Sequence, residues 1–330
     1  MDAETVRGAV LRGIILRRTA LALPILLVVT LAMFALGAAA PFDPAARYLG
    51  DALGGATTED LDRIRHNLGA DQPFYSRWWH WVTQALAGDL GDSTSQHQPV
   101  AQVIGERMGW TLLLVTVAFA GAVVFALLAG TVAAVRQGGW FDRAVTTLAY
   151  GFEAVPVFWL SLAMIWLLSL TLRWFPAGGV SDLRTGDLTA GGVLSHLVLP
   201  AVALAASQAP WFVLYVKQSV RTELAQDYVV GARARGLRPR TVVIRHVVRG
   251  ALLPFITLVG SRFPELITGA VLVETTFSWP GVAAATTEAA VALDFPLLAA
   301  LTTLATGVVL LGNLLADIVY AFADPRVVAS

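Results

Sequence analysis

Long apolar runs alternate with shorter polar connections along most of this chain. Residues 19–40 hold no charge and are long enough for one helix to cross a bilayer, which needs about 20 apolar residues. Five more apolar runs follow, at residues 109–135, 144–172, 197–216, 251–273 and 295–320. The pattern predicts an all-α integral membrane protein with six transmembrane helices and both termini on one side.

The first apolar run has two interpretations. Four arginines lie ahead of it, namely Arg7, Arg12, Arg17 and Arg18. A secretory signal peptide could end near residues 38–40, but its apolar core would be only about 7–15 residues long. We therefore expect residues 1–18 to be a cytoplasmic N-terminus and residues 19–40 to be a retained transmembrane helix.

The polar segment 41–108 is too charged to enter lipid and is predicted to lie outside the membrane. It contains one short helical pattern, in which Leu61, Ile64 and Leu68 share a face. Thr57 and Asp60 have the spacing of a capping box, and Gly69 is placed to end this helix.

Three tryptophans, Trp78, Trp79 and Trp81, cluster near the end of this segment. Such rings gather at membrane surfaces, but they would equally fill a small core outside the membrane.

The distribution of basic residues supports this topology. If residues 1–18, 136–143, 217–249 and 321–330 are cytoplasmic, they hold 15 of the 23 Lys and Arg residues. The positive-inside rule counts these residues, most reliably in short loops. Both internal loops, at 136–143 and 217–249, therefore indicate the same orientation.

Composition narrows the class further. The chain is 56% hydrophobic and 14% charged, with a mean hydropathy of +0.67, which excludes an ordinary soluble domain. It has no cysteine, so disulfides and thiolate metal sites are excluded.

The most specific pattern lies between the fourth and fifth apolar runs. Leu224, Tyr228 and Ala232 recur every four residues, which predicts one helix face with an aromatic side chain among small ones. Gly236 stands where a helix C-cap favours positive φ, and Pro239 stands where a second helix can begin. A bent helix pair is predicted. The second helix would carry Arg238, Arg240, Arg245 and Arg249 into the next apolar run.

This stretch resembles the loop with which bacterial ABC importer permeases of the dipeptide, oligopeptide and nickel class grip their ATPase. That class has DYVxxARAKG and then NALLP, where this chain has DYVVGARARG at 227–236 and RGALLP at 249–254. Arg235 replaces a usual lysine and Gly250 a usual asparagine. A basic helix pair that merely lies on anionic lipid would explain the arginines, but not Tyr228 and Gly236.

Other segments resemble the same class. They are LGADQPFY at 68–75, AGDLGDS at 87–93, QPV at 98–100, ETTFSWPG at 274–281, DFP at 294–296, NLLADIVY at 313–320 and DPR at 324–326. The usual Gly-Asp-Pro after the first helix is reduced to Phe42-Asp43-Pro44. Ala283 stands where a second glycine is common, which would stiffen the exterior turn.

The resemblance implies a permease subunit of an ATP-driven importer in the bacterial inner membrane. It would have a permease core at 109–330 with a cytoplasmic coupling loop at 217–250. It would pair with a second permease, usually a different chain, and with two ATPase domains or subunits, an exterior solute-binding protein and lipid, but not nucleic acid. ATP and magnesium would bind the ATPase, and this chain would hold no cofactor.

The residues implied in ATPase coupling are Asp227, Tyr228, Ala232, Ala234, Arg235 and Gly236. Peptides, nickel chelates, opines and glutathione-like compounds all fit the class.

Ionisable residues inside apolar runs are candidates for a translocation path, because a charge at bilayer depth costs about 2.5–3.5 kcal/mol unless it is paired or wetted. Arg262 and Glu265 are spaced to meet on one helix face, with Pro264 between them. They would either line the path or seal helix packing as an ion pair. Glu153, near Pro156, is a further candidate, whereas Asp317 is expected to cap a helix or pair with a basic loop residue.

Catalysis by this chain alone is not indicated. A P-loop needs Gly-Lys-Ser/Thr, but the one lysine, Lys217, precedes Gln218. Ser195 and His196 are adjacent, so on a helix they would point apart, and no HExxH zinc motif occurs. We predict no catalytic or metal-binding residue. The remaining alternative is a secondary transporter that moves protons through its embedded carboxylates, but that alternative does not account for the loop at 221–254.

Overall fold

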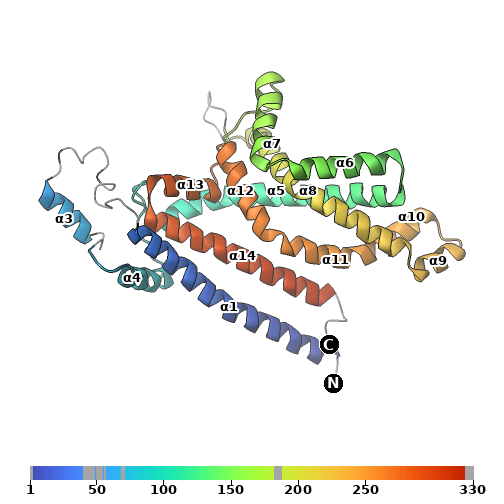
Figure 1. Ribbon diagram of the computed structural model, residues 1–330, viewed down its shortest axis with the longest axis horizontal. Coiled ribbons are helices and arrows are strands. Elements are labelled where there is room, and N and C mark those ends of the chain that lie inside the picture. The colour runs from blue at the N-terminus through green and yellow to red at the C-terminus, as the bar shows by residue number, and fades with distance from the viewer. Residues whose placement is uncertain are drawn as a thin grey trace. The chain divides into compact units, whose positions relative to one another are not determined.

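The computed structural model describes residues 3–39, 49, 55, 57–67, 71–181 and 188–323. Within these ranges the regular elements are helices, with one isolated β-bridge between Asp92 and Pro99. Four helices are long and apolar enough to cross a membrane, and up to six spans result if two bent helix pairs each count as one (Figure 1). The fold is therefore that of a multi-span helical membrane protein. The chain forms two compact units.

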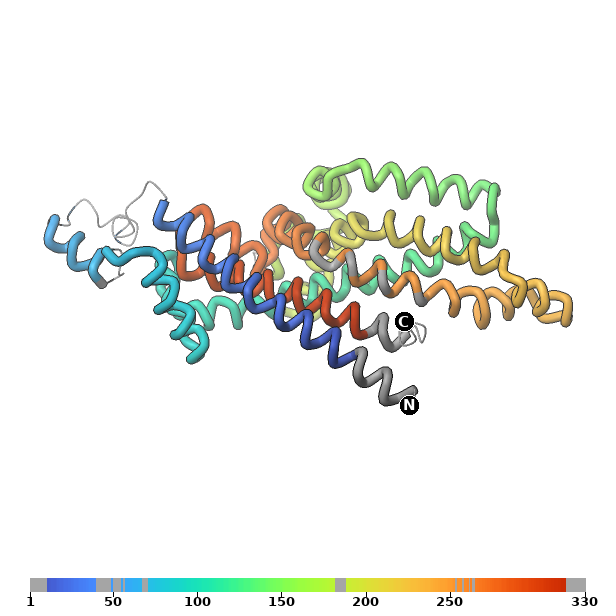
Figure 2. Tube along the Cα trace, turned by 60° about the horizontal axis from the view of Figure 1, so that its bottom comes forward, coloured from blue at the N-terminus to red at the C-terminus, as the bar shows by residue number. Residues whose placement is uncertain are grey.

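The first unit comprises residues 1–18, 110–280 and 309–330. Its central helix is α8 (Ala190–Leu224), against which α6 (Trp140–Ala154) and α11 (Val248–Ser261) both pack. Figure 2 shows α6 running beside α8. The greater part of α5 (Val100–Val135) also belongs to this unit, and its Ala122 and Ala126 are buried with α8.

The second unit comprises residues 19–109 and 281–308. Its complete helices are α3 (Thr58–Asn67), α4 (Phe74–Leu86) and α13 (Val282–Ala292). Parts of α1 (Ala3–Ala39) and of α14 (Phe295–Ala323) complete it. A small buried core joins α13, α14 and the start of α5, and is built from Val100, Val103, Ala285, Ala289, Leu297 and Leu301.

The third predicted span is not one straight helix. α6 ends at Ala154, and a bend of 104° separates it from α7 (Val157–Met164). α7 then continues into a π-helical segment, η2 (Ile165–Thr171). Pro156 causes the break, since a residue before proline is driven to extended backbone and Val155 has φ −95° and ψ 120°.

The fifth predicted span is also interrupted. α11 ends at Ser261, and α12 (Phe263–Thr276) begins after Arg262, whose φ of −92° and ψ of 1° are not helical. A further bend of 43° separates Pro239–Leu252 from Pro254–Gly260. By contrast, Pro200 and Pro210 both lie inside the unbroken 35-residue α8.

The capping box before α3 is confirmed. The Asp60 N–H donates to Thr57 Oγ1 and the Thr57 N–H donates to Asp60 Oδ2, both at 3.2 Å. The predicted end at Gly69, the third face residue Leu68, and the motifs at 42–44 and 324–326 lie outside the described residues.

The three tryptophans divide between the two interpretations. The Trp78 indole N–H donates to Thr30 Oγ1 at 2.9 Å, and Trp81 packs on Phe34 with ring centroids 5.8 Å apart. Trp79, on the same helix α4, remains 60% exposed. Trp78 and Trp81 therefore fix α4 to α1, and the Trp79 ring is exposed to the surroundings of the protein.

The turn predicted to be exterior, residues 274–281, has a buried centre. Trp279 is fully buried and donates from its indole nitrogen to the Trp110 carbonyl at 3.0 Å. Glu274 is also fully buried and accepts a 2.7 Å hydrogen bond from Thr111 Oγ1. This turn anchors the end of α12 to Trp110 and Thr111 on α5. Motif spacing alone did not reveal this role.

Candidate functional site

The loop between the fourth and fifth predicted spans begins with a break that the sequence pattern did not predict. α8 ends at Leu224, and a separate helix α9 (Asp227–Ala234) follows. Gln226 between them is extended, with φ −74° and ψ 146°. The prediction that Leu224 shares a helix face with Tyr228 is therefore wrong, because spacing of four implies a common face only within one continuous helix.

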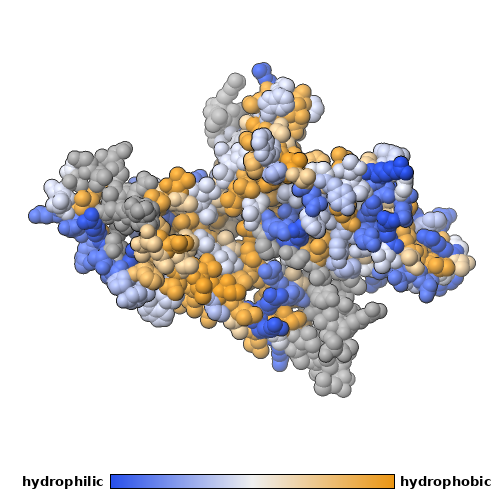
Figure 3. Space-filling view, viewed as in Figure 1, coloured by the Kyte–Doolittle hydropathy of each residue, from blue (hydrophilic) through white to orange (hydrophobic). Residues whose placement is uncertain are grey.

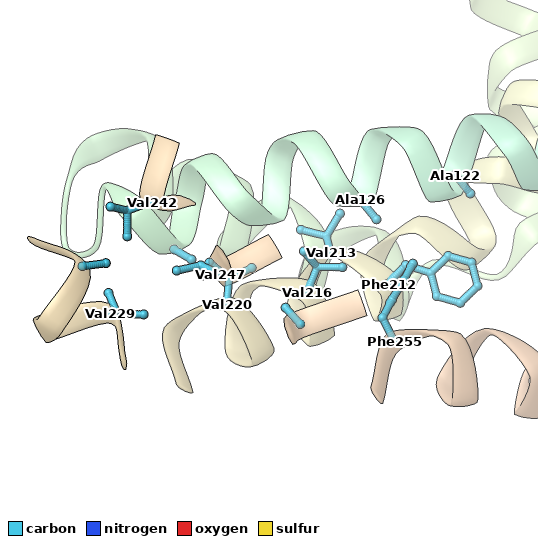
Figure 4. Close-up of a cluster of buried hydrophobic side chains, with 13 residues drawn as sticks. Ala122, Ala126, Phe212, Val213, Val216, Val220, Val229, Val242, Val247 and Phe255 are labelled. Atoms are coloured by element: carbon cyan, nitrogen blue, oxygen red, sulfur yellow. The ribbon is translucent and has the colours of Figure 1, made fainter. Parts of the chain in front are cut away.

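α9 is held by a narrow buried face. Val229 and Ala232 are 0% and 1% exposed and join one hydrophobic cluster with residues of α5, α8 and α11. Figure 4 shows Val229 at one end of this row, followed by Val242, Val220 and Val216. Ala232 is thus a packing residue, and its small side chain lets α9 approach the core.

The other predicted coupling residues lie on the surface. Tyr228 is 44% exposed, and two further apolar side chains, Val230 and Leu237, are 59% and 39% exposed. The remaining predicted residues are also exposed, namely Asp227, Ala234, Arg235 and Gly236. α9 therefore presents a mixed apolar and charged face away from its own chain.

The predicted turn after α9 is confirmed. Gly236 has φ +77°, and its N–H donates to the Arg233 carbonyl at 2.9 Å, while Leu237 N–H reaches the Ala232 carbonyl at 3.3 Å. A helix, α10 (Pro239–Val242), then starts with proline in its first turn. It continues through π-helical η3 (Val243–Val247) into α11, as the sequence predicted.

The surface around α9 is strongly basic. Six exposed arginines lie on α9, α10, η3 and the start of α11 or directly beside α9 and α10: Arg233, Arg235, Arg238, Arg240, Arg245 and Arg249. Figure 3 shows hydrophilic side chains gathered over the end of the first unit that carries α9, α10 and the connection from α5 to α6. This end suits a position in water, outside the hydrocarbon core.

Glu223 connects the helix ends of this loop. Its carboxylate accepts a hydrogen bond from the Tyr228 hydroxyl. A Cβ atom on Gly250 would lie 2.7 Å from the same carboxyl group, so Glu223 packs directly on the α11 backbone. The sequence pattern did not single out Glu223, because its spacing to Tyr228 has meaning only once the helix break is known.

A second contact that the sequence pattern missed stands nearby. Lys217 on α8 forms an ion pair with Asp142 on α6 and donates to Thr146 Oγ1 at 2.6 Å. Asp142 also accepts from the Gly138 N–H at 2.9 Å. Both charged side chains are nearly buried, at 13% and 10% exposure. The pair fastens the loop at 136–143 to the last turns of α8.

The embedded pair Arg262 and Glu265 meets as predicted. Arg262 donates to Glu265 Oε2, and its guanidinium carbon lies 4.1 Å from the centroid of the Trp211 ring on α8. Arg262 is only 14% exposed, but Glu265 is 53% exposed. The arginine is therefore used in an ion pair and in packing, whereas a place on a translocation path stays a prediction for the accessible carboxylate.

The other two ionisable residues behave differently. Glu153 is exposed in the last turn of α6, next to the break at Pro156. Asp317 accepts a 2.5 Å hydrogen bond from Arg18 Nε. The expected basic partner of Asp317 is thus present, but it comes from the N-terminal helix α1 and not from a loop.

Metal-binding residues do not gather in the part of the chain that the structure describes, where groups of three or more His, Asp and Glu suited to an ion are absent. Ser195 Oγ and His196 Nδ1 both contact the Gly192 carbonyl, at 2.7 and 2.8 Å. These two side chains serve the helix backbone and do not form a nucleophile–base pair.

Two descriptions of one protein family match the chain. The binding-protein-dependent transport system inner membrane component matches residues 101–329, and the N-terminal part of such membrane components matches residues 10–115. The two matches together cover the loop at 217–250 and every candidate span.

Individual relatives agree over nearly the full length. The oligopeptide transport system permease protein AppB of Bacillus subtilis is 35% identical over 314 residues, which is 95% of this chain and 98% of AppB. The glutathione transport system permease protein GsiC of Escherichia coli O6:H1 is 32% identical, over 92% of this chain and 95% of GsiC.

A solved structure supports the fold. An inward-facing MetNI methionine ABC transporter chain aligns with a TM-score of 0.56 at 15% identity, covering 68% of this chain and 97% of that one. These findings confirm the resemblance to ABC importer permeases of the dipeptide and oligopeptide class. The chain belongs to the family of binding-protein-dependent transport system inner membrane components.

Proposed function

We propose that this chain is one of two permease subunits of an ATP-driven importer for peptides or for a related small solute, such as a nickel chelate, an opine or a glutathione-like compound. Relatives named for oligopeptide and glutathione transport support this solute range. In the proposed assembly the partner permease is a different chain, and a solute-binding protein outside the membrane delivers the solute.

Six spans with both termini in the cytoplasm form the proposed topology. The four long apolar helices and the two bent pairs are compatible with it. The basic surface around α9 supports a cytoplasmic position for the loop at 217–250. ATP and magnesium then bind the ATPase subunits, and this chain contributes transport without catalysis.

The observation that carries the proposal is the construction of α9. Its exposed face holds Tyr228 and Val230, while its buried Val229 belongs to the same cluster as Phe212 on α8 and Phe255 on α11. Close-packed interiors transmit displacement with little compression. Closure of the ATPases would therefore move α9 together with α8 and α11, and would open the path on alternate sides of the membrane.

The proposed path runs past Arg262 and Glu265, with Glu153 as a further lining residue. A half-exposed carboxylate at bilayer depth supports this assignment, because lipid would make such exposure costly.

The experiment is purification of the chain from its native membrane in mild detergent, with mass spectrometry of the proteins that remain bound. We expect a second permease and an ATPase. Val230→Asp, which places a charge on the exposed face of α9, should remove the ATPase and keep the permease. Val291→Asp is the matched control, since Val291 is a 75% exposed valine on α13, outside the proposed contact.

A chain recovered alone, under conditions that preserve other membrane complexes, would contradict the proposal. Uptake driven by a proton gradient and insensitive to ATP depletion would then favour a secondary transporter with embedded carboxylates.

A further inference from the structure

The two members of the embedded ion pair differ in accessibility. Arg262 has its guanidinium over the Trp211 ring at 4.1 Å and donates to Glu265, so its side chain is only 14% exposed. The stacking and the ion pair both hold the cation in place. Glu265 is 53% exposed and therefore offers carboxylate surface to a further partner.

The position of this pair limits what that partner can be. α11 and α12 are 14 residues each and meet at Arg262. Arg262 is also the midpoint of the apolar run 251–273, 11 residues from each end, which at 1.5 Å per residue is about 16 Å. That places it near the middle of a hydrocarbon core about 30 Å thick. Contact of a carboxylate with lipid at this depth is unfavourable, so Glu265 must face water or polar groups.

The chemistry of the exposed group then indicates the ligand. An ionised carboxylate accepts hydrogen bonds and does not donate them, so it recognises cationic donors. The Arg262 guanidinium lies against Trp211, so the exposed part of the ion pair is the Glu265 carboxylate. A bound ammonium group would share this carboxylate with Arg262 and would bring one further positive charge to the site.

We propose that Glu265 is a specificity-determining residue that favours solutes with a free ammonium group, such as the N-terminus of a peptide. This inference rests on the proposed function, because it assumes that the pair faces the translocation path.

The test uses the complete transporter in cells that lack other peptide importers. Uptake of an equimolar tripeptide pool is compared with uptake of the same pool after N-acetylation, by mass spectrometry of the cell contents. We expect Glu265→Gln to reduce the ratio of free to acetylated uptake about tenfold, as expected for loss of one charge-assisted hydrogen bond. The solute-binding protein is the same in both strains, so a changed ratio reports on the permease.

Glu288→Gln is the matched control. Glu288 is also 53% exposed and also pairs with an arginine, Arg107, at 2.9 Å. It lies on α13 and should leave the ratio unchanged. Glu265→Asp keeps the charge and should retain most of the preference. Co-purification of the partner subunits shows that each variant assembles.

Two outcomes would overturn the inference in different ways. An unchanged ratio in an assembled Glu265→Gln complex contradicts the role of Glu265 but leaves the peptide permease intact. Absence of uptake of either pool by the unmodified complex contradicts the proposed function itself, and the inference with it. If Glu265→Gln does not assemble, Glu265→Ala, which also removes the charge, takes its place, and an unchanged ratio in that assembled complex contradicts the inference.

Discussion

The hydroxyl of Tyr228 donates a hydrogen bond to the carboxylate of Glu223 across the break between α8 and α9. The same carboxylate lies against Gly250 at the start of α11, where a Cβ would come within 2.7 Å of it. Three helices therefore meet at one side chain, and its carboxylate fills the space beside position 250.

Titration of Tyr228 tests this contact. Burial, followed by the hydrogen bond to Glu223, raises the pKa of Tyr228 to about 12. The bond should be fully present below the ordinary tyrosine pKa of about 10 and should be lost as pH rises through about 12. The measurement is tyrosinate absorbance after rapid pH jumps, taken as the difference between the unmodified chain and Tyr228→Phe, because the chain has 6 tyrosines.

Gly250→Ala should lower the pKa of Tyr228 toward its ordinary value, because the added methyl group displaces the Glu223 carboxylate. Gly231→Ala on α9 is the control, since a Cβ at Gly231 has no atom within 4 Å. A Tyr228 that still titrates near 12 in Gly250→Ala would show that Glu223 does not depend on the space at position 250.

Gly236→Val should uncouple ATP hydrolysis from uptake. Gly236 has φ +77°, where a β-branched side chain is strained by about 1–2 kcal/mol. The turn would relax and change the angle between α9 and α10. We expect the solute imported per ATP hydrolysed to fall several-fold in proteoliposomes that contain the full complex.

Gly231→Val controls for the added side chain, because both glycines have open space where a Cβ would lie and only Gly236 has positive φ. Equal coupling ratios in the two variants would contradict the role assigned to the turn.

Removal of Lys217 should destabilise the first unit. Lys217→Met leaves the buried Asp142 without its ion-pair partner, and loss of one member of a buried pair costs about 3–5 kcal/mol. The measurement is a denaturant titration of the protein in detergent, which should show a lower free energy of unfolding for Lys217→Met. Lys217→Met combined with Asp142→Leu removes both charges and should recover most of the loss. Lys217→Met with unchanged stability would mean that the pair contributes little.

Acid should weaken the anchor between the 93–95 turn and α14. Asp294 is fully buried and accepts from Ser93 Oγ at 2.5 Å and from Ser95 Oγ at 2.7 Å. Burial acts to raise the pKa of Asp294, but hydrogen bonds from Ser93, Ser95 and the Leu297 N–H together lower it. The stabilisation that ionised Asp294 gives to this anchor should therefore be present above about pH 4 and be lost as pH falls through the lowered pKa.

Hydrogen exchange of residues 91–96 measures this anchor. Asp294→Ala should increase exchange at pH 7, because donors of both serines lose their acceptor. Asp62→Ala removes a 72% exposed carboxylate from α3 and should have no effect on that segment. Protection that persists in Asp294→Ala would exclude the carboxylate as its cause.

Local chemistry was sufficient for much of this protein. Six apolar runs, the capping box of Thr57 and Asp60, the positive φ of Gly236 and the helix start at Pro239 all follow from spacing or from the torsional preferences of single residues. The motifs at 227–236 and 249–254 were also sufficient to indicate the family, which the comparisons then confirmed.

Tertiary structure decided the features that depend on distant partners. Pro156 explains why the helix breaks after Ala154, but spacing along the chain did not indicate the angle of 104° or the break at Arg262. Asp317 is paired with Arg18, 299 positions away in the sequence. Spacing along one chain constrains neighbours within a helix, whereas contacts between helices depend on how their faces meet. The sequence alone therefore determined the membrane class, the family and the local turns, and the tertiary structure determined which charges are paired and which are left exposed.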